Sequence, residues 1–145
     1  MDNFLKNKVI PDINEAKKYS IDYMPVVFPG YSFYNNGMLH QKSQRILNEI
    51  PRQCGQFLWR QSTSLIRAGA AMLYGAMFDE VNEGTALMPT VTEQSQLPVG
   101  SKMLVLNQDG CNLPDDWYLR VSGKISNLLK SGQIPPLRIE QAITP

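Results

Sequence analysis

An apolar run over residues 70–78 leads directly into an acidic sequence, FDEVNEGT, at residues 78–85. The run is short and bounded by glycines, which predicts a buried strand and not a helix. Parallel α/β folds place their chemistry at the carboxyl ends of strands, often with a glycine in the turn that follows. The feature therefore predicts an α/β fold and a candidate site at Asp79, Glu80 and Glu83.

The rest of the chain alternates helical and extended patterns. The spacing of apolar residues, with proline, glycine and charged residues at the expected ends, predicts helices over residues 11–19, 53–67 and 113–129, and strands over 23–28, 72–78 and 103–106. Residues 31–50 lack a clear period and are expected to form a long functional loop. This order predicts a parallel sheet with covering helices.

Length and charge exclude several classes of function. The 145 residues suffice for one domain with a real core, and the net charge of +1 provides no basic surface for nucleic acid or acidic membranes. No apolar run approaches the roughly 20 residues that a membrane-spanning helix needs. The amino-terminal sequence lacks a signal-peptide pattern, so localisation stays open.

Metal and redox chemistry find little support in the sequence. His40 is the single histidine, so a multi-histidine metal site within one chain is excluded, and no cofactor is expected. Cys54 and Cys111 either pair or stay reduced, and two cysteines do not decide the compartment.

The carboxylates Glu80 and Glu83 stand three residues apart, with Asp79 beside them. Cleavage of a glycosidic bond characteristically needs two carboxylates, one of which gives a proton. Three acids within five residues repel one another, which is expected to raise at least one pKa and keep that carboxyl protonated. The alternative is a solvated acidic loop, the usual state of exposed carboxylates.

A second candidate segment follows the earlier strand. Tyr31, Phe33 and Tyr34 come directly after Pro29-Gly30, and aromatic rings stack on sugar faces while tyrosine hydroxyls bond to sugar oxygens. These rings could equally pin the long loop in place. By contrast, Trp59 lies within a predicted helix, where core packing is the better interpretation.

These motifs together resemble a known family. The acidic motif resembles the F-N-E-W-x-E-G-T signature of glycoside hydrolase family 99, the endo-α-mannosidases and endo-α-mannanases, and is similar to the N-D-W-x-E-S element of family 71, the α-1,3-glucanases. The Pro-Gly-Tyr at residues 29–31 looks like an element of the same enzymes. The longer pattern, closest to family 71/99-like proteins, adds residues 24–32, 50–52, 57–61 and 113–119.

The resemblance implies a TIM barrel whose carbohydrate cleft lies at the carboxyl ends of the strands. It implies that Glu80 assists the 2-hydroxyl of the sugar as an internal nucleophile and that Glu83 is the general acid/base. Tyr31, Tyr34 and Asp79 would then contact substrate. Two positions depart from the family 99 pattern: Val81 replaces its aromatic residue, and Asp79 replaces its asparagine.

A complete barrel of this kind needs about 250 residues. We therefore expect a partial (β/α)8 barrel made of about the last three βα units, a fragment or truncated product, with residues 1–133 in the barrel part and 134–145 as an irregular tail. A partial barrel leaves strand edges and an apolar face uncovered, so self-association is expected.

Two functions stay open. The first is hydrolysis of α-linked glycans by the Glu80 and Glu83 pair. The alternative is a non-catalytic carbohydrate-binding or scaffold remnant of such an enzyme. A nucleotide-binding α/β protein is disfavoured, because no glycine-rich phosphate loop follows any predicted strand.

Overall fold

The computed structural model of the chain describes residues 2–42 and 45–139. The helices are α1 (Asp2–Phe4), which continues through a π-helical turn (Leu5–Val9) into α2 (Ile10–Lys18), then α3 (Tyr34–Leu39), α4 (Gln56–Arg67) and α5 (Trp117–Ser131). The strands are β1 (Val26–Val27) and β2 (Tyr74–Gly75), and four 3-10 turns cover Gln53–Gly55, Val81–Glu83, Gln94–Gln96 and Leu106–Asp109. No helix in the described part of the chain is long and apolar enough to cross a membrane.

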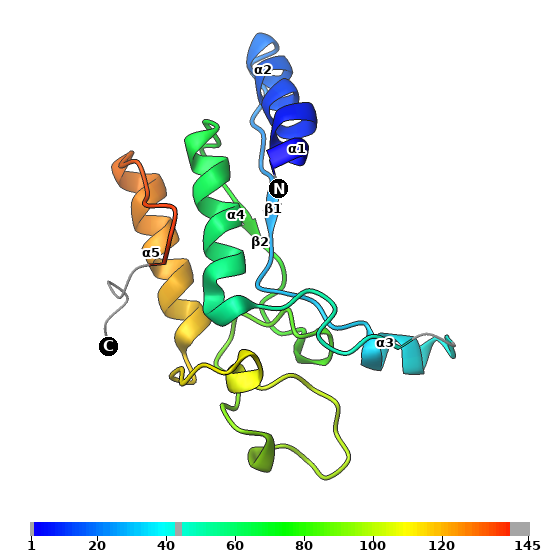
Figure 1. The fold of residues 1–145 in the computed structure, drawn as a ribbon. Helices are drawn as coiled ribbons and strands as arrows, with labels where there is room; N and C mark the ends of the chain where they lie inside the picture. Colours follow the sequence, from blue (N-terminus) through cyan, green and yellow to red (C-terminus); the bar gives the residue numbers. More distant parts are fainter. Residues whose placement is uncertain (1, 43–44, 140–145) are drawn as a thin grey trace.

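The two strands form a parallel pair, with Val26 opposite Tyr74 and Val27 opposite Gly75. Helix α4 provides the crossover between them, as expected for parallel neighbours, so the predicted parallel sheet is confirmed (Figure 1). The hydrogen bonds continue one residue beyond each strand: the Tyr74 N–H donates to the Pro25 carbonyl at 3.0 Å and the Ala76 N–H to the Val27 carbonyl at 2.8 Å.

Both strands are shorter than the predicted ranges 23–28 and 72–78. A strand exists only where its backbone groups find a partner, and within the described residues the sheet has two members. Beyond the paired residues other groups take the backbone. The Gln61 side chain, for example, donates from Nε2 to the Phe28 carbonyl at 2.8 Å, on the edge of β1 that faces away from β2.

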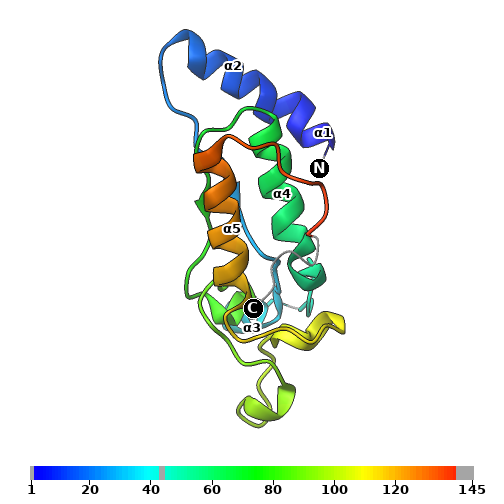
Figure 2. The ribbon, with the colours of Figure 1, turned by 90° about the vertical axis from the view of Figure 1, so that its left-hand side faces the viewer.

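Helices α4 and α5 lie side by side on one face of the strand pair, as Figures 1 and 2 both show. Apolar residues at helical spacing face inward on each helix: Leu58, Trp59 and Leu65 on α4, and Tyr118, Val121, Ile125 and Leu128 on α5. Trp59 is 2% exposed, so its predicted place in the core is confirmed. The same face of the sheet contributes Val27 to this core.

Helix boundaries agree with the sequence pattern at most ends. Helix α2 begins with Pro11 in its first turn, and α4 ends before Gly69, whose φ of 95° is left-handed. Helix α5 begins at Trp117, later than the predicted start at residue 113, because Pro114 and the acids after it form the preceding turn, in which the Trp117 N–H donates to the Pro114 carbonyl at 3.1 Å. Gly132, with φ 63°, ends α5 as predicted.

The strand expected in the apolar run was predicted to be buried, but both residues of β2 are exposed. Two further predictions about local structure were wrong. Residues 103–106 form no strand in the described chain; instead the Leu106 N–H donates to the Val91 carbonyl at 3.1 Å, and the Arg52 guanidinium donates to the Val105 carbonyl. These contacts satisfy the backbone without a neighbouring strand. The expected irregular loop over residues 31–50 contains helix α3, which its two asparagines and its glycine had obscured.

The structure decides the state of the two cysteines, which the sequence had left open. Cys54 and Cys111 form a disulfide with a Cα–Cα distance of 5.9 Å across 57 residues of sequence. The bridge joins the turn before α4 to the segment before α5. The Gln53 N–H adds a 2.6 Å hydrogen bond to the Asp109 carboxylate in the same region.

The segment after α5 has no regular structure up to residue 139, and it packs along α4. The Arg67 side chain donates to the Pro135 carbonyl at 2.6 Å, and the Trp59 indole donates to the Pro136 carbonyl at 3.0 Å. The proposed division at residue 133 stays a prediction, and residues 140–145 of the predicted tail lie outside the described residues.

Candidate functional site

The acidic loop, residues 79–84, follows β2 and is closed tightly at its base. The Met77 N–H donates to the Thr85 carbonyl at 3.3 Å, and the Leu87 N–H donates to the Phe78 carbonyl at 3.0 Å. Segments on the two sides of the loop therefore run against each other. The acidic residues therefore lie at the carboxyl end of the strand pair, as we predicted from the sequence.

Within the loop, Val81–Glu83 forms a single 3-10 turn, labelled η3. Gly84 ends it with a left-handed φ of 68°, and a Cβ atom at this position would lie 2.7 Å from Cδ1 of the buried Leu104. Both the backbone angle and the lack of space require glycine here.

Glu80 is held from within its own loop. The Thr85 N–H donates to the Glu80 carbonyl at 3.3 Å. The Thr85 hydroxyl donates to the same carbonyl at 3.3 Å and lies 3.4 Å from the Glu80 carboxylate oxygen Oε2. Thr85 is itself buried, so it fixes the start of the turn that carries both glutamates.

Glu83 is held from a different part of the chain, the α3 arm, which we define as residues 31–40. The Ser32 N–H donates to the Glu83 carbonyl at 2.7 Å. The Asn36 side chain donates from Nδ2 to the Glu83 carboxylate oxygen Oε1, also at 2.7 Å. The neighbouring Asn35 side chain donates to the Asn82 carbonyl at 3.0 Å.

The base of the α3 arm is anchored by a bridge and a close approach. Tyr31 and Ile50 exchange two backbone hydrogen bonds of 2.9 Å. A Cβ at Gly30 would lie 2.7 Å from the Ile50 carbonyl oxygen, so this glycine lets the two segments meet. The arm therefore starts from a fixed point next to the sheet, and its first residues reach η3.

Electrostatics distinguish Glu83 in this group. Partial burial raises the pKa of Glu83, and the nearby Glu80 carboxyl raises it further, while the hydrogen bond from Asn36 opposes the rise. The predicted upward shift of one carboxyl pKa in the cluster is confirmed, although burial contributes more than repulsion. Because its pKa is raised, Glu83 keeps a proton to higher pH than an ordinary glutamate does.

The other residues predicted to contact substrate are held less firmly than the two glutamates. Tyr31 is half-buried, with its ring centroid 6.4 Å from that of Phe33, and Tyr34 is half-buried in the first turn of α3. The Asp79 side chain is exposed, and among the described residues no hydrogen bond joins its carboxylate to another group. The structure thus brings Glu80 and Glu83 together with the base of the α3 arm, while Asp79 points to solvent.

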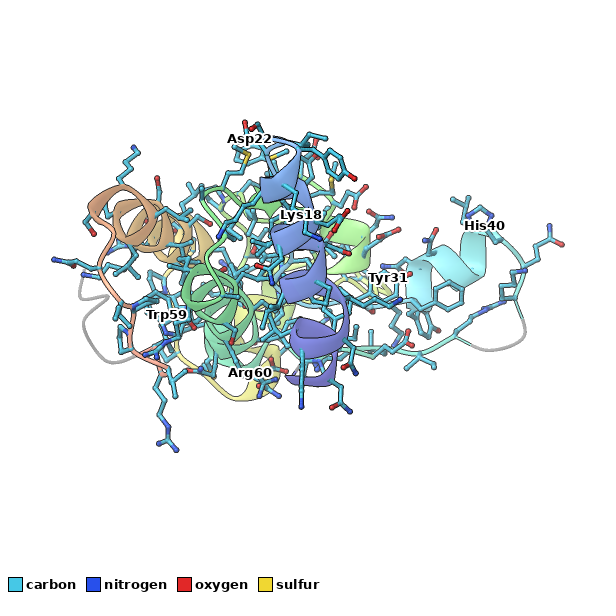
Figure 3. All side chains as sticks on the ribbon, turned by 90° about the horizontal axis from the view of Figure 1, so that it is seen from above. Lys18, Asp22, Tyr31, His40, Trp59 and Arg60 are labelled. Atoms are coloured by element: carbon cyan, nitrogen blue, oxygen red, sulfur yellow. A yellow bond between two sulfur atoms is a disulfide. The ribbon has the colours of Figure 1, made fainter. Side chains whose placement is uncertain are left out.

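Figure 3 shows Tyr31 at the base of the α3 arm and His40 at its far end. His40 is exposed and stands beyond the last turn of the helix, away from the acidic loop. Trp59 and Arg60 lie on α4, outside this site. Among the described residues no cluster of three or more histidine, cysteine or acidic side chains could hold a metal ion.

Asn35 and Asn36 were missed by sequence reasoning. Amides in a polar segment suggest solvated surface, and their partners lie 47 residues further along the chain. The available signal was their position directly after the Pro-Gly-Tyr segment, in the loop already expected to be functional.

Comparison with solved structures identifies the fold. The chain is similar to the GH99 endo-alpha-mannosidase from Bacteroides thetaiotaomicron, with a TM-score of 0.67 and 20% identity over 85% of this chain. It is also similar to that enzyme in complex with BIS-TRIS-propane, with a TM-score of 0.63 and 21% identity over 82% of this chain. Each match covers 33% of the enzyme chain. No protein-family model and no curated protein sequence matches.

The chain therefore has the fold of part of a GH99 TIM-barrel enzyme and spans about a third of the length of the structures it matches. This confirms the expected partial barrel in its coarse form. Only one adjacent strand pair of that barrel is formed within the described residues, not the three strands predicted.

Proposed function

We propose that this chain carries the acid-bearing part of a glycoside hydrolase that cleaves α-linked glycans. The observation that carries the proposal is Glu83, whose pKa is raised by burial and by Glu80, in a closed loop at the carboxyl end of β2. A carboxyl that keeps its proton beside one that accepts charge is the arrangement that glycoside cleavage uses. Similarity of fold to an endo-alpha-mannosidase supports a carbohydrate substrate.

In this proposal Glu83 is the general acid/base and gives its proton to the leaving sugar oxygen. Glu80 accepts a hydrogen bond from the 2-hydroxyl of the sugar and so assists it as an internal nucleophile. Tyr31, Tyr34 and Asp79 are proposed to contact the glycan. The exposed Asp79 suits a contact that forms only when substrate arrives, whereas the half-buried Tyr31 offers a ring edge at the base of the α3 arm.

The test is turnover of α-linked mannan and glucan oligosaccharides by the purified chain and by three variants. Glu80→Gln and Glu83→Gln should each abolish whatever hydrolysis the chain has. Glu15→Gln serves as the matched control, because Glu15 lies on α2 in an exposed pair with Lys18 and contacts nothing in the site. Equal turnover in all four proteins would reject the assigned roles.

The second candidate is a carbohydrate-binding remnant without catalysis. The favouring observation is that the matches cover only a third of the enzyme chain. Binding of oligosaccharide that is followed by NMR shifts, without turnover at any pH, would favour this candidate. Ordinary glycosidase turnover by the isolated chain would exclude it.

Self-association is part of the same proposal. The face of the strand pair opposite the helices exposes two paired apolar side chains, with Val26 57% and Tyr74 44% exposed. The outer edge of β1 also has no strand beside it within the described residues. We propose that these surfaces pair or aggregate when the chain is alone.

A further inference from the structure

Glu83 is held at two points by the α3 arm. The Ser32 N–H binds its backbone carbonyl, and the Asn36 amide binds its carboxylate. The two donors come from opposite ends of a single short segment, residues 32–36, and α3 packs against η3. Main chain and side chain of Glu83 are therefore both set by one element that is remote in sequence.

The bond from Asn36 selects one of the two carboxylate oxygens. Nδ2 of Asn36 lies 2.7 Å from Oε1 of Glu83, and the contact is partly buried. Among the described residues no donor reaches the other oxygen, Oε2. A carboxyl whose Oε1 already accepts a strong hydrogen bond carries its proton on Oε2, because Nδ2 of the amide is a donor only.

We propose that Asn36 is a positioning residue that fixes the plane of the Glu83 carboxyl and directs its Oε2 proton away from α3, toward the space above the acidic loop. The inference rests on the proposed function for its catalytic meaning. The positioning itself requires only the geometry of the α3 arm and η3. Asn36 thus joins the site although it belongs to no acidic motif.

Asn35 provides a matched comparison on the same helix. Its amide donates to the backbone carbonyls of Asn82 and Lys102, at 3.0 and 3.4 Å, and does not touch a carboxylate. Both asparagines therefore tie α3 to the loops beneath it, but only Asn36 acts on the acid. Replacing either asparagine weakens the attachment of α3, but only the replacement of Asn36 removes a hydrogen bond to the Glu83 carboxylate. A comparison of the two variants therefore separates a structural effect from an effect on Glu83.

Titratable residues lie on each element packed around this carboxyl: Asp79 and Glu80 on the acidic loop, Tyr31, Tyr34 and His40 on the α3 arm, and Lys102 on the segment that Asn35 binds. Of these charges, that of Glu80 acts on the pKa of Glu83. The amide of Asn36 stabilises the ionised form of Glu83 and so lowers a pKa that burial and Glu80 raise. Loss of the amide leaves both raising influences unopposed.

The experiment is an NMR titration of the Glu83 side-chain carboxyl in the absence of substrate. Asn36→Ala should raise the pKa of Glu83 above that of the wild type, whereas Asn35→Ala should leave it unchanged. Glu80→Gln should lower it, which verifies that the resonance reports on this carboxyl. An unchanged pKa in Asn36→Ala, or an equal rise in Asn35→Ala, would overturn the inference.

Asn36→Asp covers the case in which the alanine variant does not fold. It keeps the shape of the side chain and replaces the donor by a carboxylate, so the pKa of Glu83 should rise further than in any neutral variant. A pKa equal to that of the wild type would again overturn the inference. If these shifts occur in a chain that hydrolyses no glycan, the proposed function fails and the positioning of Glu83 stands.

Discussion

Replacement of Gly84 by alanine tests how the acidic loop is built. The backbone at this position has φ 68°, a conformation that costs an L-residue about 1–2 kcal/mol. The added Cβ would also lie 2.7 Å from Cδ1 of Leu104, which is buried and must leave its preferred rotamer at a further cost of about 0.5–1.5 kcal/mol. The sum is a loss of about 1.5–3.5 kcal/mol.

The measurement is the free energy of unfolding by urea, with Tm from calorimetry as a second readout. For a chain of this size the expected loss lowers Tm by about 5–12 °C. Gly100→Ala is the matched control, because Gly100 has a similar left-handed φ of 81° and no atom within 4 Å of a new Cβ. The Gly100→Ala variant should lose only the stability that the left-handed backbone conformation costs.

The difference between the two variants isolates the contact with Leu104. The double variant Gly84→Ala with Leu104→Ala should lose less than the sum of the single losses, because the shorter side chain makes room for the new Cβ. Equal stability of the Gly84 and Gly100 variants, or strict additivity in the double variant, would refute the claim that Leu104 leaves no room for a Cβ at position 84.

Three further predictions concern pH, the disulfide and association. The pKa of Glu83 is raised in the folded chain, so this residue contributes its full stabilisation at low pH and loses it as the pH rises from the unfolded pKa through the folded pKa. Glu83→Gln should therefore flatten the decline of the unfolding free energy with pH across the acidic range. An unchanged slope in denaturation experiments would contradict this prediction. Reduction of the bridge between Cys54 and Cys111, which closes 57 residues, should lower the unfolding free energy by about 4 kcal/mol in the chain-entropy account, whereas an unaltered Tm in dithiothreitol would argue against it. Light scattering after size exclusion should detect oligomers that the variant Val26→Glu with Tyr74→Glu disperses, and a clean wild-type monomer would disprove self-association.

Much of the fold could be predicted because its helices follow local rules. Apolar spacing located α4 and α5, and the glycines at positions 69 and 132 marked their ends. The strands were predicted in the right places but too long, since the length of a strand depends on a neighbour that the local sequence does not contain. Residues 103–106 failed for a similar reason, because the Arg52 side chain takes a carbonyl that a strand partner would otherwise take.

The candidate site, too, contains residues that could be predicted from the local sequence and residues that could not. Glu80 and Glu83 could be predicted because a strand, two acids and a glycine are adjacent in sequence. Helix α3 and the role of Asn36 could not, because asparagine and glycine disfavour a helix locally and the helix packs on η3, 47 residues away. The rise in the Glu83 pKa was predicted from repulsion, whereas its larger cause, burial, depends on tertiary packing.

The hydrogen bond from Gln61 to the Phe28 carbonyl has a consequence for assembly. Carbonyls alternate between the two edges of a strand, and those of Pro25 and Val27 face β2, so the carbonyls of Val26 and Phe28 face outward. Gln61 occupies the second of these with its amide and is itself 5% exposed. A strand that added to this edge would therefore find an acceptor at Val26, whereas the Phe28 carbonyl already accepts the amide of Gln61. A buried glutamine on α4 thus limits how far backbone hydrogen bonding can extend along this edge of β1.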